Sequence, residues 1–212
     1  MALCSLTDVK VMLNIPSLDT SKDEKLNLLI KQVSAQIEAY IGYKLARKEY
    51  TEELHAVNCR QLLTLNHFPI QNVATVTHNG EEITDYLVID EYSKWGRLYR
   101  EFGWGGKLIT QGFEHDVVSG AYDYKVTYTA GYYLPGDTDY VEGDSESLPY
   151  DISVACCQMV CLKYNLDEQG AVGLKSHSEG NISDTYADCA SDAGLSESVK
   201  LALKKYVFYG VA

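Results

Sequence analysis

Residues 21–42 read SKDEKLNLLIKQVSAQIEAYIG, a stretch that predicts one long amphipathic helix. Residues 21–24 have the spacing of a capping box, and Gly42 stands where helices commonly end in a left-handed glycine. Leu28 lies off the main stripe and extends a second face for contacts. We therefore expect a rod of about twenty residues, roughly 30 Å long, with one face buried. That face holds Leu26, Leu29, Ile30, Val33, Ile37, Tyr40 and Ile41.

Three further helices are predicted. A short first helix begins after Ser5 or Thr7, either of which can cap it, and runs to about residue 13. The third begins near Pro149 and runs to about residue 164, with no charged side chain between residues 151 and 163. A helix that is apolar nearly all round is either the central core helix or is covered by a second subunit. The last helix starts at Ser196.

Between residues 44 and 129 the hydrophobic period changes from helical to alternating. Asn79-Gly80 is a two-residue hairpin signal between predicted strands at 73–78 and 81–84. Further strands are expected at 60–65, 86–89 and 97–99, and around residues 124–129, where apolar side chains alternate with polar ones. The sequence predicts the α+β class. We expect a small helical domain of about four helices, residues 1–43 and 126–212, with an inserted antiparallel β module in the middle, residues 44–125.

Three stretches outside these elements are predicted to be loops. Residues 102–107, FGWGGK, lack the spacing of a phosphate-binding loop, so we expect two aromatic side chains packing down from a turn. Residues 131–147 are irregular and acidic, as in a solvated loop. Residues 170–194 are rich in Gly, Ser and Asp, and we expect a long loop that becomes ordered on contact with a partner.

Composition narrows the class of function. The 212 residues are 46% hydrophobic and 23% charged, as in a soluble globular protein. No apolar run approaches the roughly 18 to 20 residues that span a bilayer, and the N-terminus lacks the pattern of a secretory signal. The net charge of −12 disfavours a protein that grips nucleic acid through its phosphates. Seventeen tyrosines beside four phenylalanines are typical of a protein that works by contact.

Catalytic and metal-binding signals are weak. Three of the six cysteines fall within residues 156–161, but no second pair and no histidines stand at ligand spacing, so we expect buried thiols in a reducing compartment. The motifs GxSxG, HExxH and GxGxxG are missing from the sequence. We therefore predict a protein that is not an enzyme and that has no metal site and no cofactor. The six cysteines are Cys4, Cys59, Cys156, Cys157, Cys161 and Cys189.

The order of these elements resembles the phage head-tail connector family, also called head completion or adaptor proteins, which form a ring beneath the portal. The β insertion departs from the smallest members, which are nearly all helical, but larger relatives carry one. The segments that carry the resemblance are LTDVK (6–10) with LNI (13–15), LNLLI (26–30) with IEAYIG (37–42), VTYTAGY (126–132) with LP (148–149) before an apolar helix, and the polar loop 176–186 before the final helix.

The resemblance implies a ring of about twelve subunits with head-to-tail contacts that close. Its partners would be further copies of itself, the portal protein and a downstream tail or stopper protein, with no membrane. It would lie in the virion neck, after assembly in the host cytoplasm. DNA would pass through only as cargo, and a net-negative ring makes few lasting phosphate contacts with it.

We predict that contacts with other subunits or with the portal come from the second and third helices, residues 170–194 and the tail after residue 206. Two alternatives stay open: another neck or tail-completion protein, and a DNA-packaging protein that binds nucleic acid through the helix-turn-helix of residues 6–41. The neighbour that copurifies tests the first, and an electrophoretic shift with DNA tests the second. The candidate contact residues are Leu28, Tyr40, Met159, Tyr164, Ile182, Tyr186, Tyr206, Phe208 and Tyr209.

Overall fold

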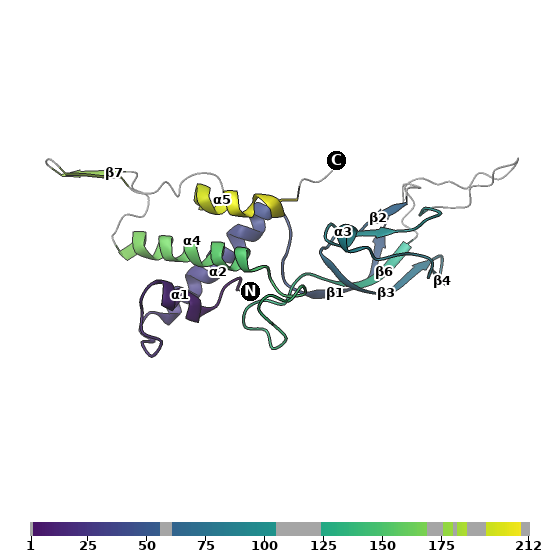
Figure 1. Ribbon diagram of the computed structural model, residues 1–212, viewed down its shortest axis with the longest axis horizontal. Helices are drawn as coiled ribbons and strands as arrows, with labels where there is room; N and C mark the ends of the chain where they lie inside the picture. Colours follow the sequence, from purple (N-terminus) through teal and green to yellow (C-terminus); the bar gives the residue numbers. More distant parts are fainter. Residues whose placement is uncertain are drawn as a thin grey trace, which may run out of the picture. The chain divides into compact units, whose positions relative to one another are not determined.

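The computed structural model (Figure 1) describes residues 2–55, 61–104, 124–168 and 194–208, and the backbone of 176–179 and 182–185. Two compact units form, Met1–Lys44 with Tyr133–Ala212, and Leu45–Tyr132. The first holds helices and the second an antiparallel sheet, so the predicted α+β class with an inserted β module is confirmed. No helix in the described part of the chain combines the length and the apolar character needed to cross a bilayer.

The helical unit consists of α1 (Leu6–Met12), α2 (Asp23–Ile41), α4 (Tyr150–Glu168) and α5 (Glu197–Leu203), followed by the short 3-10 helix η2 (Lys204–Tyr206). Helix α4 packs against α1, α2 and α5, with α1 and α5 on opposite sides of it (Figure 1). It is therefore the central core helix, the first of the two alternatives. Its buried side chains include Ile152, Ala155, Cys156, Met159 and Val160.

Helix α2 matches the prediction along its length but not at its first turn. Leu26, Ile30, Val33, Ile37 and Ile41 are fully or almost fully buried. At the C-terminal end, the cap residue has φ +90° and its N–H donates to the Glu38 carbonyl at 3.0 Å, as expected of the predicted glycine cap.

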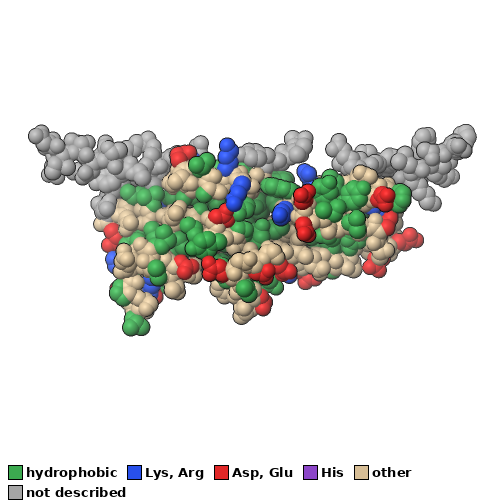
Figure 2. Space-filling model, in the orientation of Figure 1, with side chains coloured by type: hydrophobic (Ala, Val, Ile, Leu, Met, Phe, Trp, Pro, Cys, Tyr) green, Lys and Arg blue, Asp and Glu red, His purple; other side chains and the backbone are tan. Residues whose placement is uncertain are grey.

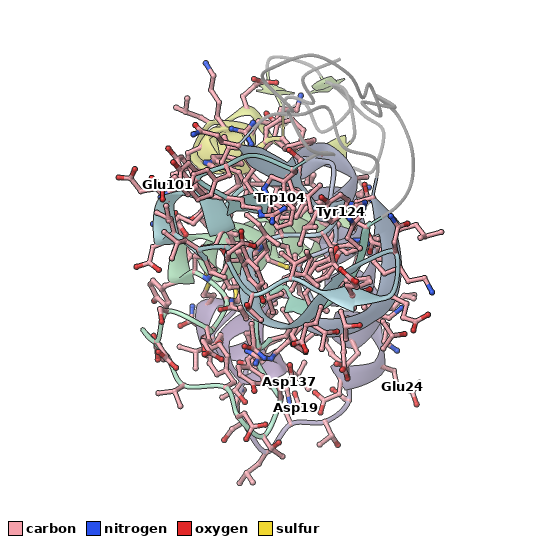
Figure 3. All side chains as sticks on the ribbon, turned by 90° about the vertical axis from the view of Figure 1, so that its right-hand side faces the viewer. Asp19, Glu24, Glu101, Trp104, Tyr124 and Asp137 are labelled. Carbon is pink, nitrogen blue, oxygen red and sulfur yellow. The ribbon has the colours of Figure 1, made fainter. Side chains whose placement is uncertain are left out.

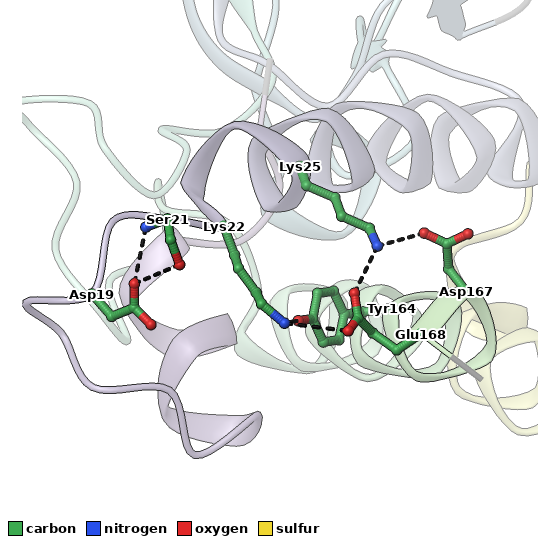
Figure 4. A network of polar contacts seen from close by, with 7 residues as sticks. All are labelled: Asp19, Ser21, Lys22, Lys25, Tyr164, Asp167 and Glu168. Carbon is green, nitrogen blue, oxygen red and sulfur yellow. Dashed lines mark hydrogen bonds and ion pairs between the residues drawn. The ribbon is translucent and has the colours of Figure 1, made fainter. Parts of the chain in front are cut away.

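The predicted capping box at residues 21–24 is wrong. The residue that caps α2, Lys22, makes no side-chain cap hydrogen bond. Ser21 instead donates from its N–H and its hydroxyl to Asp19 Oδ1, at 2.9 and 2.7 Å (Figure 4). The hydrogen bonds of Ser21 therefore stabilise the turn before α2 and do not cap the helix. At α1, by contrast, the Ser5 hydroxyl accepts from the Asp8 N–H at 3.0 Å, so Ser5 rather than Thr7 is the cap.

A buried ion pair joins α1 to α2. The Lys10 ammonium is buried, lies 2.6 Å from Asp23 Oδ1, and also donates to the Asp19 carbonyl at 2.8 Å. One charged side chain of α1 thus holds both the first turn of α2 and the loop before it.

The β unit contains β1 (Lys48–His55), β2 (Leu62–Thr64), β3 (Ile70–His78), β4 (Glu81–Glu82), α3 (Asp90–Ser93), β5 (Arg97–Tyr99) and β6 (Tyr124–Ala130). The main sheet has the order β1-β6-β3-β4, and its strand pairs are antiparallel; β2 and β5 form a second ladder. Strand β6, the last strand of the β unit along the chain, lies between β1 and β3. Its alternation is confirmed, since Tyr124, Val126 and Tyr128 are buried.

The predicted hairpin is confirmed, with Asn79 and Gly80 at φ +52° and +85° between β3 and β4. The strand predicted at 86–89 is wrong, since only an isolated bridge from Leu87 to Tyr99 forms there. Of the two aromatic side chains expected to pack down in the glycine-rich segment, only Trp104 does so. It is buried in edge-to-face contact with Tyr124 (both are labelled in Figure 3), whereas Phe102 is 84% exposed.

Residues 133–148 form the predicted irregular loop, and hydrogen bonds between its two ends close it. The Tyr133 N–H donates to the Glu146 carbonyl and the Leu148 N–H donates back to the Tyr133 carbonyl, both at 2.9 Å. One of its acids has a structural role, since Asp137 Oδ2 accepts from the Leu134 N–H at 2.7 Å. In the segment predicted as one long loop, residues 170–194, a hairpin of β7 (Ser176–Glu179) and β8 (Ile182–Thr185) stands instead; residues 169–175, 180–181 and 186–193 lie outside the described residues.

Candidate interaction surface

Two of the predicted contact residues lie in the core of the helical unit. Met159 is fully buried on α4, and Tyr164, nearer the end of the same helix, is almost fully buried. The Tyr164 hydroxyl accepts a hydrogen bond from the Lys22 ammonium, so this tyrosine joins α4 to the start of α2.

Three other predicted residues hold α5 and the chain after it against the rest of the unit. The Tyr40 hydroxyl donates to the Lys200 carbonyl at 3.4 Å, and the Tyr206 hydroxyl donates to Asp151 Oδ1 at 2.7 Å. The Phe208 N–H donates to the carbonyl of Ile41 at 2.9 Å, next to the glycine that ends α2.

Leu28 alone among the predicted contact residues with a described side chain is largely exposed, at 67%, on the solvent face of α2. The side chain of Ile182 is not described, and Tyr186 and Tyr209 lie outside the described residues. The roles of these residues in contacts between molecules stay predictions.

A network of charges joins the N-terminal end of α2 to the C-terminal end of α4 (Figure 4). The Lys25 ammonium lies 2.6 Å from Asp167 Oδ2 and 2.9 Å from Glu168 Oε1, and hydrogen bonds to these two carboxylates raise the pKa of Lys25. Lys22 reaches Glu168 at 3.2 Å. The hydrogen bonds from Lys25 and Lys22 lower the pKa of Glu168. These charged groups all have partners within the subunit, so the network fixes α2 to α4.

A groove of about 490 Å³ opens in the helical unit between α1, the loop 133–148 and the first turns of α4. Its walls are apolar and acidic, and no described lysine, arginine or histidine lines it. The carboxylates are those of Asp8 and Glu142. The other lining residues are Ser5, Val11, Met12, Pro135, Gly136, Tyr140, Tyr150, Ser153, Val154 and Cys157.

Large apolar side chains along this groove face solvent. Val11 is 70% exposed and Tyr150 64%, and Met12 is also exposed. Exposed apolar side chains that gather in one patch, with polar residues at the rim, mark interaction sites in soluble proteins. Burial, together with the negative charges of Glu142 and Asp8, raises the pKa of Tyr140. The two carboxylates make the groove electrostatically complementary to a surface of positive charge.

The opposite side of α4 carries a surface of the reverse charge. Leu201 on α5 is 74% exposed, and Lys204 and Lys205 follow it in η2, both exposed. Figure 2 shows basic side chains over α5, and the basic residues of α5 and η2 are lysines. Lys205 is 2.6 Å from Asp151 Oδ2 within the subunit. We call Leu201, Lys204 and Lys205 the basic α5 face.

Sequence reasoning missed both surfaces, although their residues carry a readable signal. Val9 is buried and Val11 exposed on the seven-residue α1, so this helix has apolar side chains on two faces. The same holds for α5, where Val199 and Leu203 are buried and Leu201 is exposed. When a short helix has apolar residues on two faces, its own subunit covers one face and leaves the other exposed.

The thiols are buried as predicted at Cys4, Cys156 and Cys157, and Cys161 is half-buried. Hydrogen bonding to its neighbours Cys156 and Cys157, with burial, raises the pKa of Cys4, so this thiol stays protonated. Burial also raises the pKa of Cys161, to about 11. Cys59 and Cys189 lie outside the described residues. Among the residues that are described, no group of three or more His, Cys, Asp or Glu side chains is arranged to hold a metal ion.

In the β unit, one carboxylate organises a polar cluster. Glu53 lies 3.2 Å from His55 Nε2 and 3.6 Å from His67 Nε2, and accepts from the Tyr128 hydroxyl at 3.1 Å. Burial lowers the pKa of His55, opposed by the charge of Glu53. The cluster follows a bulge in β1 and ties that strand to the sheet, which is a structural role.

Known proteins include relatives of this chain in fold and in family, although no curated protein matches the sequence. The fold is similar to that of a chain in the neck of an empty gene transfer agent particle computed with C6 symmetry, at 14% identity and a TM-score of 0.52, over 99% of this chain and 92% of that one. It is also similar to a chain of the native gene transfer agent virion, at 13% identity and a TM-score of 0.51, with the same coverage.

The family model for head completion proteins matches residues 2–206, almost the full length of the chain. The resemblance seen in the sequence is thereby confirmed, and the chain belongs to the head completion protein family.

Proposed function

We propose that this protein is a structural connector of the virion neck that joins the capsid to the tail. Copies of it form a ring. The portal protein binds one side of this ring, and a downstream tail or stopper protein binds the other side. The genome passes through the ring without being held. The helical domain supplies the contacts between subunits.

The observation that carries this proposal is the match to the head completion family over residues 2–206. The surface of the helical unit supports it. An apolar, acidic groove and an exposed basic face are features of a protein that works by contact. A ring with head-to-tail contacts needs two different surfaces on each subunit, and the helical unit offers two.

We also propose that the protein has no catalytic activity. The groove has two carboxylates on open apolar walls, and a general base or nucleophile needs a partner that tunes its pKa. The carboxylate in the β unit, Glu53, is shared among neighbours that fix the fold.

The experiment that tests the connector role is a phage that lacks this protein, complemented by purified protein added to the lysate. We expect heads and tails that accumulate separately, and tailed particles once the protein is added. Infectious tailed particles made without the protein would overturn the proposal.

A shorter variant tests docking onto the portal. A chain that lacks residues 209–212 should keep the helical circular dichroism of the full chain but bind portal protein more weakly. Portal binding equal to that of the full chain would contradict the docking role of the tail. Copurification with a tail protein in place of portal would favour the alternative of a tail-completion protein.

The passage of DNA as cargo has its own test. With a net charge of −12, the ring should bind duplex DNA weakly even at low salt. Tight binding with a steep dependence on salt concentration would favour the alternative of a DNA-packaging protein.

A further inference from the structure

We propose that the basic α5 face of one copy of this chain docks into the acidic apolar groove of the next copy. This inference rests on the proposed function, because it assumes that the chain forms a ring. It names the two surfaces that the ring contact joins and gives the contact a direction.

The placement of the two surfaces supports a contact between copies. The groove is built from α1, the loop 133–148 and the start of α4, whereas α5 packs on the other side of α4 (Figure 1). A face and a groove on opposite sides of one helix do not satisfy each other within one chain. Each copy therefore offers one of each surface to its neighbours, which is the requirement for a head-to-tail ring.

The chemistry of the two surfaces is complementary. The groove pairs exposed apolar side chains, such as Val11 and Tyr150, with the carboxylates of Asp8 and Glu142. The α5 face pairs the exposed Leu201 with the ammonium group of Lys204, next to Lys205, which pairs with Asp151 within the subunit. Docking would place leucine against apolar walls and put lysine beside carboxylate, as complementary interfaces do.

Cysteine cross-linking in assembled particles tests the contact directly. A variant with Leu201→Cys and Val11→Cys in the same chain should give a ladder of disulfide-linked multimers on oxidation, because each copy links to the next. Each single variant should give only chains that are not cross-linked. The matched control combines Leu201→Cys with Leu18→Cys, which is also exposed but lies before α2 and outside the groove, and it should give no ladder.

The outcomes separate this inference from the proposed function. Particles that contain the protein in the neck but give no ladder overturn the docking of α5 into the groove and leave the connector role intact. A cross-link from residue 201 to a different virion protein also overturns it, because the occupant is then not a second copy. Absence of the protein from virions overturns the proposed function itself.

A charge exchange provides an independent readout. Lys204→Glu or Glu142→Lys alone should lower the yield of tailed particles by about tenfold or more, and the two together in one chain should restore it. Lys205 is left unchanged because it pairs with Asp151 inside the subunit. Single variants with normal yields and wild-type circular dichroism would contradict the proposed contact.

Discussion

Gly131, in the VTYTAGY segment, packs closely against the backbone of the chain that precedes β1. Its φ is +97°, and a Cβ built on it would lie 2.4 Å from the Ala46 carbonyl oxygen and 2.8 Å from the Arg47 nitrogen. Both neighbours are backbone atoms, so no side-chain rotation relieves the overlap. Gly131→Ala is therefore expected to push two backbone segments of the β unit apart.

The structure sets the magnitude of this change. An L side chain at positive φ costs roughly 1–2 kcal/mol. The overlap also disturbs the hydrogen bonds from the Tyr132 N–H to the Leu45 carbonyl, 2.7 Å, and from the Arg47 N–H to the Tyr132 carbonyl, 2.9 Å. Each hydrogen bond contributes about 1 kcal/mol net. We expect Gly131→Ala to lower the free energy of unfolding of the β unit by about 3–4 kcal/mol.

Gly80→Ala is the matched control. Gly80 also has positive φ, +85°, but nothing lies within 4 Å of a Cβ built there. It should show only the conformational cost, so the two variants should differ by about 2 kcal/mol.

Urea titration followed by tryptophan fluorescence makes this measurement on the β unit alone. Both tryptophans of the chain, Trp95 and Trp104, lie in residues 45–132. A difference between the two variants below about 0.5 kcal/mol would refute the argument that crowding at Gly131 matters.

Further predictions concern the helical unit, and each is checked by circular dichroism during urea titration. Lys10→Met removes the buried partner of Asp23 and should cost about 2–3 kcal/mol; a change near zero would contradict the role of that ion pair. Met159→Ala, at a fully buried position, should cost about 2–5 kcal/mol, and a smaller loss would mean that the core around α4 collapses into the space.

Acid should weaken the attachment of η2 to α4. Burial raises the pKa of Asp151, but hydrogen bonds from Lys205 and Tyr206 outweigh it, so the net pKa is lower than the usual 3.8. The stability from this carboxylate is therefore present above pH 3.8 and is lost as the pH falls through the lower folded pKa. Tyr206→Phe should shift that loss to higher pH, and an unchanged acid profile would argue against the contact.

The sequence predicted elements whose local pattern and tertiary environment agree. Helix α2 has apolar residues at helical spacing and a terminal glycine, and its stripe packs on α4. Strand β6 alternates because it lies in the middle of the sheet with one face covered.

Elements that depend on their neighbours were missed. Strand β1 reads KEYTEELH, with three glutamates and no run of alternating apolar residues, because it is an edge strand whose pairing with β6 decides its conformation. The groove was missed for a related reason: periodicity shows that Val11 is apolar, but only the packed unit shows that Val9 is covered and Val11 is not. The sequence alone is compatible with Met159 either as a core residue or as a contact residue. In the packed unit its side chain is fully buried.

The direct test of the central claim is a cryo-electron microscopy reconstruction of the neck in virions that carry this protein. We predict a closed ring of this chain between portal and tail, with density into which the helical unit fits. A neck fully accounted for by other proteins, with this chain absent from the particle, would contradict the account.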